Sequence, residues 1–127
     1  WLKEHLYKKG LVTSQIYDYC RRVAGRKLIV CDNSEPRLLS EMKTKNPPLN
    51  VTPTIKKAGS ILSGIALMQD YNINLDGENL VKEFNNYAWS VKGLKPMDNF
   101  NHLIDASRYG IQYVLTRSVP KGMYIVR

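Results

Sequence analysis

The chain has 127 residues and a formal net charge of +8, from 19 Lys and Arg against 11 Asp and Glu. This length suits a single domain over residues 1–127, and the charge favours a polyanionic partner, nucleic acid before an anionic membrane surface. No apolar run approaches the roughly 20 residues that span a bilayer. No Gly-rich phosphate loop ending in Lys-Ser or Lys-Thr occurs, which excludes a nucleotide-driven motor of that class.

Apolar runs and turn signals predict the first elements. Residues Trp1 to Tyr7 can form the tail of a strand. A helix is expected from Thr13 or Ser14, either of which can cap it, through Arg22, with Gly25 ending it. The run Leu28 to Cys31 is short, continuous and apolar, which is typical of a strand buried on both faces.

A second helix and strand are predicted to follow directly. The helix is expected over about Glu35 to Lys45, with Ser34 as its cap and Pro36 in the first turn, where the missing N–H costs nothing. It must end before Pro47-Pro48. A strand is then expected over about Leu49 to Ile55.

The second half of the chain continues the alternation. The expected elements are a basic loop over Lys56 to Gly59, a helix capped by Ser60 and running to Gln69, a short strand at Ile73 and Leu75, a turn at Gly77, a short helix from Leu80 to Asn85, and a strand through Tyr87, Trp89 and Val91. A last helix is expected from near Asp98 to about Thr116, with an apolar face of Phe100, Leu103, Ile104, Ile111 and Val114. This order predicts an α/β fold with an at least partly parallel sheet.

The two cysteines are predicted to be buried free thiols. Cys20 falls in a predicted helix and Cys31 at the end of a predicted strand, and neither belongs to a CxxC or Cys/His metal spacing. Free thiols suit a reducing cytoplasm.

Asp32 is the first candidate for a functional residue. Ligands and catalytic groups in open α/β sheets collect beyond the carboxyl ends of strands, and Asp32 directly follows an apolar run. A turn residue that helps to start the next helix would occupy the same place. Position alone leaves both interpretations open.

The second candidate site lies on the last predicted helix. At about 100° per residue, Asp98, His102, Asp105 and Tyr109 fall on one stripe. Two carboxylates and an imidazole on one stripe suit a divalent cation such as Mg²⁺ or Mn²⁺. A solvated helix face has the same pattern, so this alternative also remains.

Four groups of residues occur in a fixed order between Glu4 and Leu115. They are Asp32-Asn33-Ser34-Glu35-Pro36 after an apolar strand, Lys57 and Ser60 ahead of Ile65, then Leu80, Glu83, Tyr87 and Trp89, and finally Asn101-His102-Leu103-Ile104-Asp105-Ala106 with Arg108-Tyr109. Together they resemble the nuclease domain of tailed-phage terminase large subunits. The last group is the most specific part of this resemblance.

The resemblance implies a ribonuclease H-like mixed sheet flanked by helices. It also implies a DNA endonuclease that cuts concatemeric viral DNA during packaging, using two Mg²⁺ or Mn²⁺ ions held by acidic residues. Carried over by position, Asp32 and Asp105 become catalytic metal ligands, His102 a ligand or close neighbour, and Asp98 a weaker candidate.

Basic side chains are needed to hold DNA beside such an acidic centre. Lys57 is the first candidate because the family pattern has a lysine there, followed by Lys56, Arg108 and Lys43, each of which could instead be an ordinary solvated charge. The implied partners are double-stranded viral DNA, the terminase small subunit and the portal protein. The implied location is the host bacterial cytoplasm.

The sequence also departs from the family pattern. The family's first catalytic aspartate lies on an opening strand that follows a packaging ATPase, and neither has a counterpart here, so we expect this fragment to be inactive by itself. We also expect Leu28 to Val30 to form an open sheet edge, covered by a second copy, by a swapped strand or by Trp1 to Tyr7. The alternatives are a non-catalytic module that contacts DNA and the portal, and a recombination nuclease or transposase of the same fold, which the terminase-like order after Tyr71 disfavours.

Overall fold

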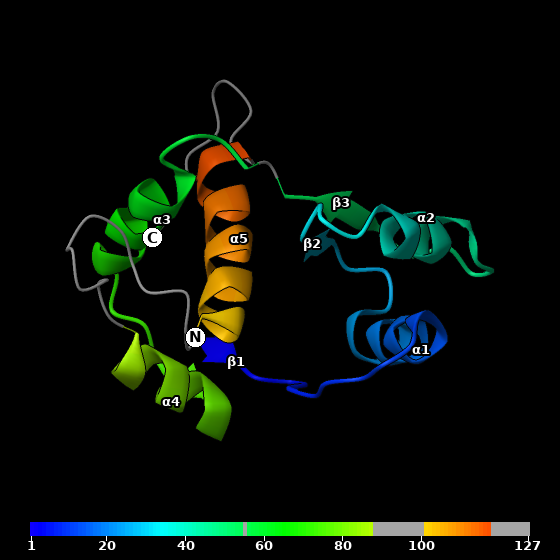
Figure 1. Cartoon of the computed structure of the whole chain (residues 1–127), viewed down its shortest axis with the longest axis horizontal. Coiled ribbons are helices and arrows are strands. Elements are labelled where there is room, and N and C mark those ends of the chain that lie inside the picture. The colour runs from blue at the N-terminus through cyan, green and yellow to red at the C-terminus, as the bar shows by residue number, and fades with distance from the viewer. Residues whose placement is uncertain (55, 88–100, 118–127) are drawn as a thin grey trace. The chain divides into compact units, whose positions relative to one another are not determined.

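The computed structural model describes residues 1–54, 56–87 and 101–117. In chain order its elements are β1 (Leu2–Lys3), α1 (Thr13–Ala24), β2 (Ile29–Cys31), α2 (Pro36–Thr44), β3 (Val51–Pro53), α3 (Ser60–Gln69), β4 (Leu75–Asp76), α4 (Glu78–Asn86) and α5 (His102–Arg117) (Figure 1). They form two compact units, unit 1 with Trp1–Tyr7 and Lys56–Arg127, and unit 2 with Lys8–Ile55.

Unit 2 is a β-α-β arrangement preceded by one helix. Its strands β2 and β3 are parallel, with Ile29 opposite Val51 and Cys31 opposite Pro53, as the alternating pattern predicted. Helix α2 forms the crossover between them, which is how parallel neighbours are normally connected. The core of this unit consists of Tyr17, Leu39, Met42, Leu49 and Val51.

The helix boundaries in unit 2 follow the breakers in the sequence. Gly25 ends α1 as predicted, with a φ of 58° and an N–H that donates to the Arg21 carbonyl at 3.0 Å. Pro36 occupies the start of α2, also as predicted.

The predicted helix caps were wrong. Val12, not Thr13 or Ser14, precedes α1, and its N–H donates to the Gln15 side chain at 3.0 Å. Glu35 rather than Ser34 precedes α2, and Ser60 is itself the first residue of α3, after Gly59. In each case the preferred cap residue type lies within one or two positions of the observed boundary, which is the usual variation at helix ends.

Strand β2 is less buried than expected. Its three residues are half-buried, and Leu28 just before it is 42% exposed. Among the described residues β2 is hydrogen-bonded to β3 alone, so its other edge is open. The suggestion that Trp1 to Tyr7 covers this edge was wrong, because Leu2 and Lys3 pair in parallel with Leu75 and Asp76.

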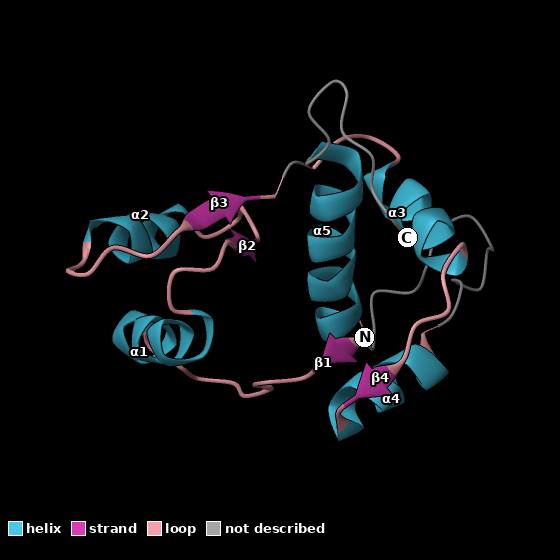
Figure 2. Ribbon diagram, turned by 180° about the vertical axis from the view of Figure 1, so that it is seen from behind, coloured by secondary structure: helices cyan, strands magenta, loops and turns pink. Residues whose placement is uncertain are grey.

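In its described part, unit 1 combines the small β1–β4 pair with helices α3, α4 and α5, which Figure 2 also shows. Helix α5 packs against both α3 and α4. Met68, Leu80 and Ile104 are buried where these helices meet. Val114, expected on the apolar face of the last helix, is instead 54% exposed.

Several predicted features fall outside the described residues. They are Ile55, the Trp89 and Val91 part of the predicted strand, Phe100, and Asp98 as the start of the last helix, which is described from His102. Of the helices described, none has the length and apolar composition that crossing a membrane requires.

The two cysteines are free and half-buried in unit 2. Burial raises the pKa of Cys31 to about 11, with smaller contributions from the charges of Cys20 and Asp32. Burial also raises the pKa of Cys20. Both are therefore neutral thiols near pH 7, which makes them weak nucleophiles.

Glu4, just after β1, fixes the start of α4. Its Oε2 accepts the Leu80 N–H at 2.9 Å, and its Oε1 accepts the Asn79 side-chain amide at 2.7 Å. Gly77, with a φ of 149°, leaves room for this approach, since a Cβ there would collide with Glu4. The carboxylate therefore replaces the missing acceptors of the first turn of α4.

This cap is expected to make α4 sensitive to acid. Hydrogen bonds from the Asn79 side chain and the Leu80 N–H hold the pKa of Glu4 below its ordinary 4.5. The stabilisation is therefore present above pH 4.5 and is lost as the pH falls through the lower folded-state value. Amide exchange in α4, corrected for intrinsic rates, should show this loss in the wild type and not in Glu4→Gln. An identical pH dependence in both proteins would contradict the role of Glu4.

Candidate functional site

The first turn of α5 carries two of the predicted metal-binding residues. His102 is its first residue and is exposed, and Asp105 lies in the same turn and is half-buried. The ring of Tyr7 lies beside His102, with ring centroids 6.4 Å apart. Histidine and aspartate three positions apart on one helix face can reach a common ion.

Asp105 forms an ion pair with Arg108. An Arg108 Nη atom donates to Oδ1 of Asp105 at 3.0 Å, and the side chains are 4% and 28% exposed for Arg108 and Asp105 respectively. Burial leaves little guanidinium surface for a DNA phosphate. In this structure Arg108 therefore orients Asp105 instead of offering the free positive charge that the sequence suggested.

A glycine on α3 accommodates the buried stem of Arg108. A Cβ placed on Gly64 would lie 2.5 Å from Cγ and Cδ of Arg108 and 2.8 Å from Cδ of Gln112. Gln112 also links the two helices, since its side-chain amide donates to the Ser60 carbonyl at 2.9 Å and its Oε1 accepts from Arg108 at 3.3 Å. Helix α3 thus supports Arg108, which in turn holds Asp105.

Glu83 on α4 is buried at the start of α5. It is 2% exposed, and its Oε2 accepts the N–H groups of Leu103 at 2.6 Å and Ile104 at 3.1 Å. These N–H groups have no acceptor within the helix. The resemblance included Glu83 but gave it no role. The signal in the sequence was an acidic residue three positions after Leu80 on the inward face of a short helix.

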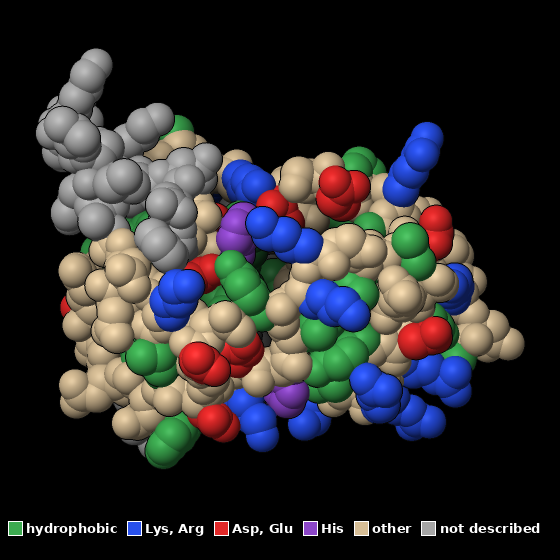
Figure 3. Space-filling view, turned by 60° about the horizontal axis from the view of Figure 1, so that its bottom comes forward, with side chains coloured by type: hydrophobic (Ala, Val, Ile, Leu, Met, Phe, Trp, Pro, Cys, Tyr) green, Lys and Arg blue, Asp and Glu red, His purple; other side chains and the backbone are tan. Residues whose placement is uncertain are grey.

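The three candidate lysines for DNA binding are exposed. Lys56 lies over the ring of Tyr109, with its Nζ 5.8 Å from the ring centroid, and Lys57 lies in the turn before α3. Lys43 lies near the end of α2 in unit 2. Figure 3 shows Lys and Arg side chains interspersed with Asp and Glu on the face in view.

Asp32 lies directly after β2 and is half-buried. Its Oδ1 accepts the Ser34 N–H at 3.0 Å, which is the turn-forming contact that the sequence left open. This contact occupies one carboxylate oxygen and does not exclude metal binding. Asp32 belongs to unit 2 and Asp105 to unit 1.

The residue types in the first turn of α5 suit a divalent cation. His102 and Asp105 offer imidazole and carboxylate donors, which Mn²⁺ accepts. Within residues 1–54, 56–87 and 101–117, no group of three His, Cys, Asp or Glu side chains is placed to hold a metal ion. Asp98, the remaining candidate, lies outside the described residues.

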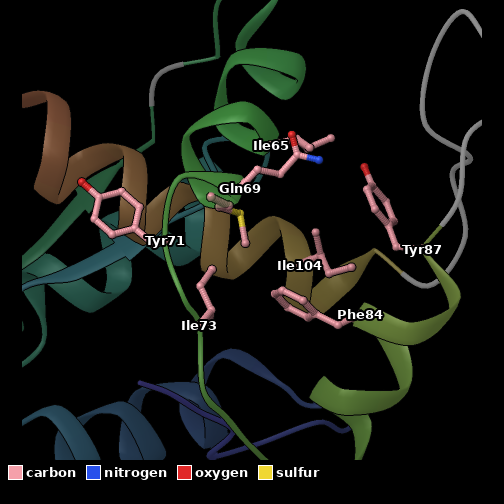
Figure 4. A pocket seen from close by; sticks show the side chains of 8 residues that line it. Ile65, Gln69, Tyr71, Ile73, Phe84, Tyr87 and Ile104 are labelled. Atoms are coloured by element: carbon pink, nitrogen blue, oxygen red, sulfur yellow. The ribbon is translucent and has the colours of Figure 1, made fainter.

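A separate cavity of about 300 Å³ lies where α3, α4 and α5 meet. Figure 4 shows Ile65 and Gln69 of α3, Phe84 of α4 and Ile104 of α5 among the side chains around it. None of the described residues that line it is acidic, basic or a histidine.

Comparison with solved structures identifies the fold. The nuclease domain of g2p, the large terminase of bacteriophage SPP1, solved with bound Mn, matches 80% of this chain with a TM-score of 0.66 and 23% sequence identity. The chain therefore has the terminase nuclease fold. The ribonuclease H-like class predicted from the sequence is thus confirmed.

The terminase nuclease fold is matched over part of its length. The aligned region spans 63% of the SPP1 domain. No protein-family model matches the sequence, and no curated protein matches it. The similarity therefore shows the fold.

Proposed function

We propose that this chain is the nuclease module of a phage DNA-packaging terminase, a metal-dependent DNA endonuclease that cuts concatemeric viral DNA. The observation that carries the proposal is the match to a terminase nuclease domain solved with bound Mn. The predicted ligands His102 and Asp105 lie together in the first turn of α5, which supports it.

Asp105 and Asp32 are the proposed catalytic metal ligands, with His102 beside them and Asp98 as a further candidate. Two bound Mg²⁺ or Mn²⁺ ions would supply an activated water and stabilise the leaving 3′ oxygen of a phosphodiester. The chain's own contribution is orientation, since Arg108 fixes one oxygen of Asp105 and leaves the other available.

DNA is the proposed substrate, held through its phosphates by exposed lysines. Lys57 and Lys56 lie close together in sequence in unit 1, and Lys43 would add a contact from unit 2. Such contacts fix the backbone without reading the sequence. The terminase small subunit and the portal are the further proposed partners, and the host bacterial cytoplasm is the proposed location.

A shared metal site predicts that unit 2 responds to an ion bound at α5. Mn²⁺ added to the isotope-labelled chain should broaden the NMR signals of Asp32 together with those of His102 and Asp105, because a paramagnetic ion relaxes nearby nuclei. Asp105→Asn should remove the broadening at Asp32 as well. Broadening at Asp105 without any at Asp32 would exclude Asp32 as a ligand, and none at either would refute the metal site.

A non-catalytic module that contacts DNA and the portal is the second candidate function. The net charge of +8 permits it, because basic side chains bind DNA phosphates without cleavage. Mn²⁺-dependent nicking of plasmid DNA by the chain extended upstream separates the two functions. Cleavage supports the nuclease, and DNA binding without cleavage supports the docking module.

A further inference from the structure

Both proposed ligands of unit 1 lie at the N-terminal end of their helix, where backbone N–H groups have no partner within the helix. His102 and Asp105 belong to the first turn of α5. The first N–H groups of a helix have no acceptors within it, and helix ends fray. The directions of these two side chains therefore depend on what accepts the N–H groups of that turn.

Glu83 provides the acceptor from a different helix. Its Oε2 accepts from both Leu103 and Ile104, the two residues between His102 and Asp105. A carboxylate bonded to helix N–H groups is a strong, charge-assisted acceptor, and its charge complements the positive end of the helix dipole. Glu83 is 2% exposed, so the surrounding side chains restrict its position.

Tyr7 lies beside the same turn of α5. Its ring centroid is 6.4 Å from that of His102. Glu83 thus borders the first turn of α5 through its backbone N–H groups, and Tyr7 borders it through the imidazole.

We propose that Glu83 is a positioning residue that holds the first turn of α5 so that His102 and Asp105 face one divalent cation together. This inference rests on the nuclease function proposed above. Glu83 acts through the Leu103 and Ile104 N–H groups, without itself contacting the cation. Its loss should therefore alter the metal affinity more than the fold.

Glu4 offers a matched control within the same unit. It caps α4 as Glu83 caps α5, with its Oε2 accepting the Leu80 N–H at 2.9 Å. Helix α4 carries no proposed metal ligand, and Glu83 lies beyond its first turn, outside the part that Glu4 caps. Replacing either glutamate by glutamine keeps the side-chain volume and one carbonyl acceptor and removes one negative charge, so the two variants differ chiefly in which helix start they loosen.

The test compares Mn²⁺ affinity and amide exchange in wild type, Glu83→Gln and Glu4→Gln. Affinity is measured from the electron paramagnetic resonance signal of free Mn²⁺, with circular dichroism to confirm folding. Glu83→Gln should weaken Mn²⁺ binding by about tenfold, as is typical for a residue that orients ligands. It should also speed amide exchange at Leu103 and Ile104. Glu4→Gln should bind Mn²⁺ like wild type and speed exchange at Leu80 instead.

Three results would overturn the inference in distinguishable ways. Equal Mn²⁺ affinity in Glu83→Gln and Glu4→Gln, with both folded and with Asp105→Asn unable to bind, refutes the positioning role and leaves the proposed function standing. If Asp105→Asn binds Mn²⁺ as tightly as wild type, the proposed function is refuted. The positioning role of Glu83 is then refuted as well. Unchanged exchange at Leu103 and Ile104 in Glu83→Gln refutes the cap in either case.

Discussion

Asp105→Asn is expected to lower metal-dependent DNA nicking by roughly a thousandfold or more in the domain extended upstream, because a neutral amide is a poor ligand for the activating ions. The nicking rate is measured with supercoiled plasmid as the substrate in the presence of Mn²⁺. Asp70→Asn, which changes an exposed acid in the same unit, should nick at the wild-type rate. Near-normal nicking by Asp105→Asn would remove Asp105 from the catalytic site.

The structure also explains why asparagine is a better replacement than alanine. Arg108 is 3% exposed and donates to Asp105. Alanine would leave a buried guanidinium without its carboxylate, which costs about 3 kcal/mol in comparable cases. Asparagine keeps an acceptor for Arg108. Asp105→Ala is therefore expected to destabilise the domain as well as to remove the ligand, and urea titration of both variants measures the difference.

Gly64→Ala is expected to destabilise unit 1 by about 2 kcal/mol, the usual range for overpacking. The added methyl would lie 2.5 Å from the Arg108 stem, which is buried and cannot move aside into solvent. Displacing Arg108 should also shift Asp105 and weaken Mn²⁺ binding. Chemical denaturation gives the free energy of unfolding, and Mn²⁺ titration gives the affinity.

Gly110→Ala provides the control with the opposite expected sign. Gly110 lies within α5, and a Cβ placed there meets no atom within 4 Å. Alanine should therefore stabilise the helix by roughly 0.5–1 kcal/mol through its higher helix propensity. If both variants changed stability in the same direction, contact with Arg108 would not be the cause of the Gly64 effect.

Local signals in the sequence located most elements of the fold. Gly25 and Pro36 mark helix ends through their own backbones. Gly25 adopts a positive φ after α1, and Pro36 lacks an N–H at the start of α2. The last residue of the helix that ends at Gln69 was predicted as observed, whereas Ser60 is its first residue and not its cap. The apolar run before Asp32 identified a parallel strand, although its length and burial were overestimated.

The sequence also indicated the candidate site. His102 and Asp105 are three residues apart, and one helical turn places them on the same face. The terminase nuclease fold expected from those motifs is the fold observed. Asp32 belongs to the other unit, and spacing along the chain does not encode the distance between side chains of two units.

The supports of the site depend on contacts between residues far apart in the chain, and only the tertiary structure shows them. Glu83 reaches Leu103 across 20 positions, and Glu4 reaches Leu80 across 76. Arg108 appeared to be a surface cation because its charge favours water, yet Gly64 on another helix creates the space that buries it. Residue type and spacing determine helix and strand tendencies, whereas the partner of a buried charge depends on which helices pack together.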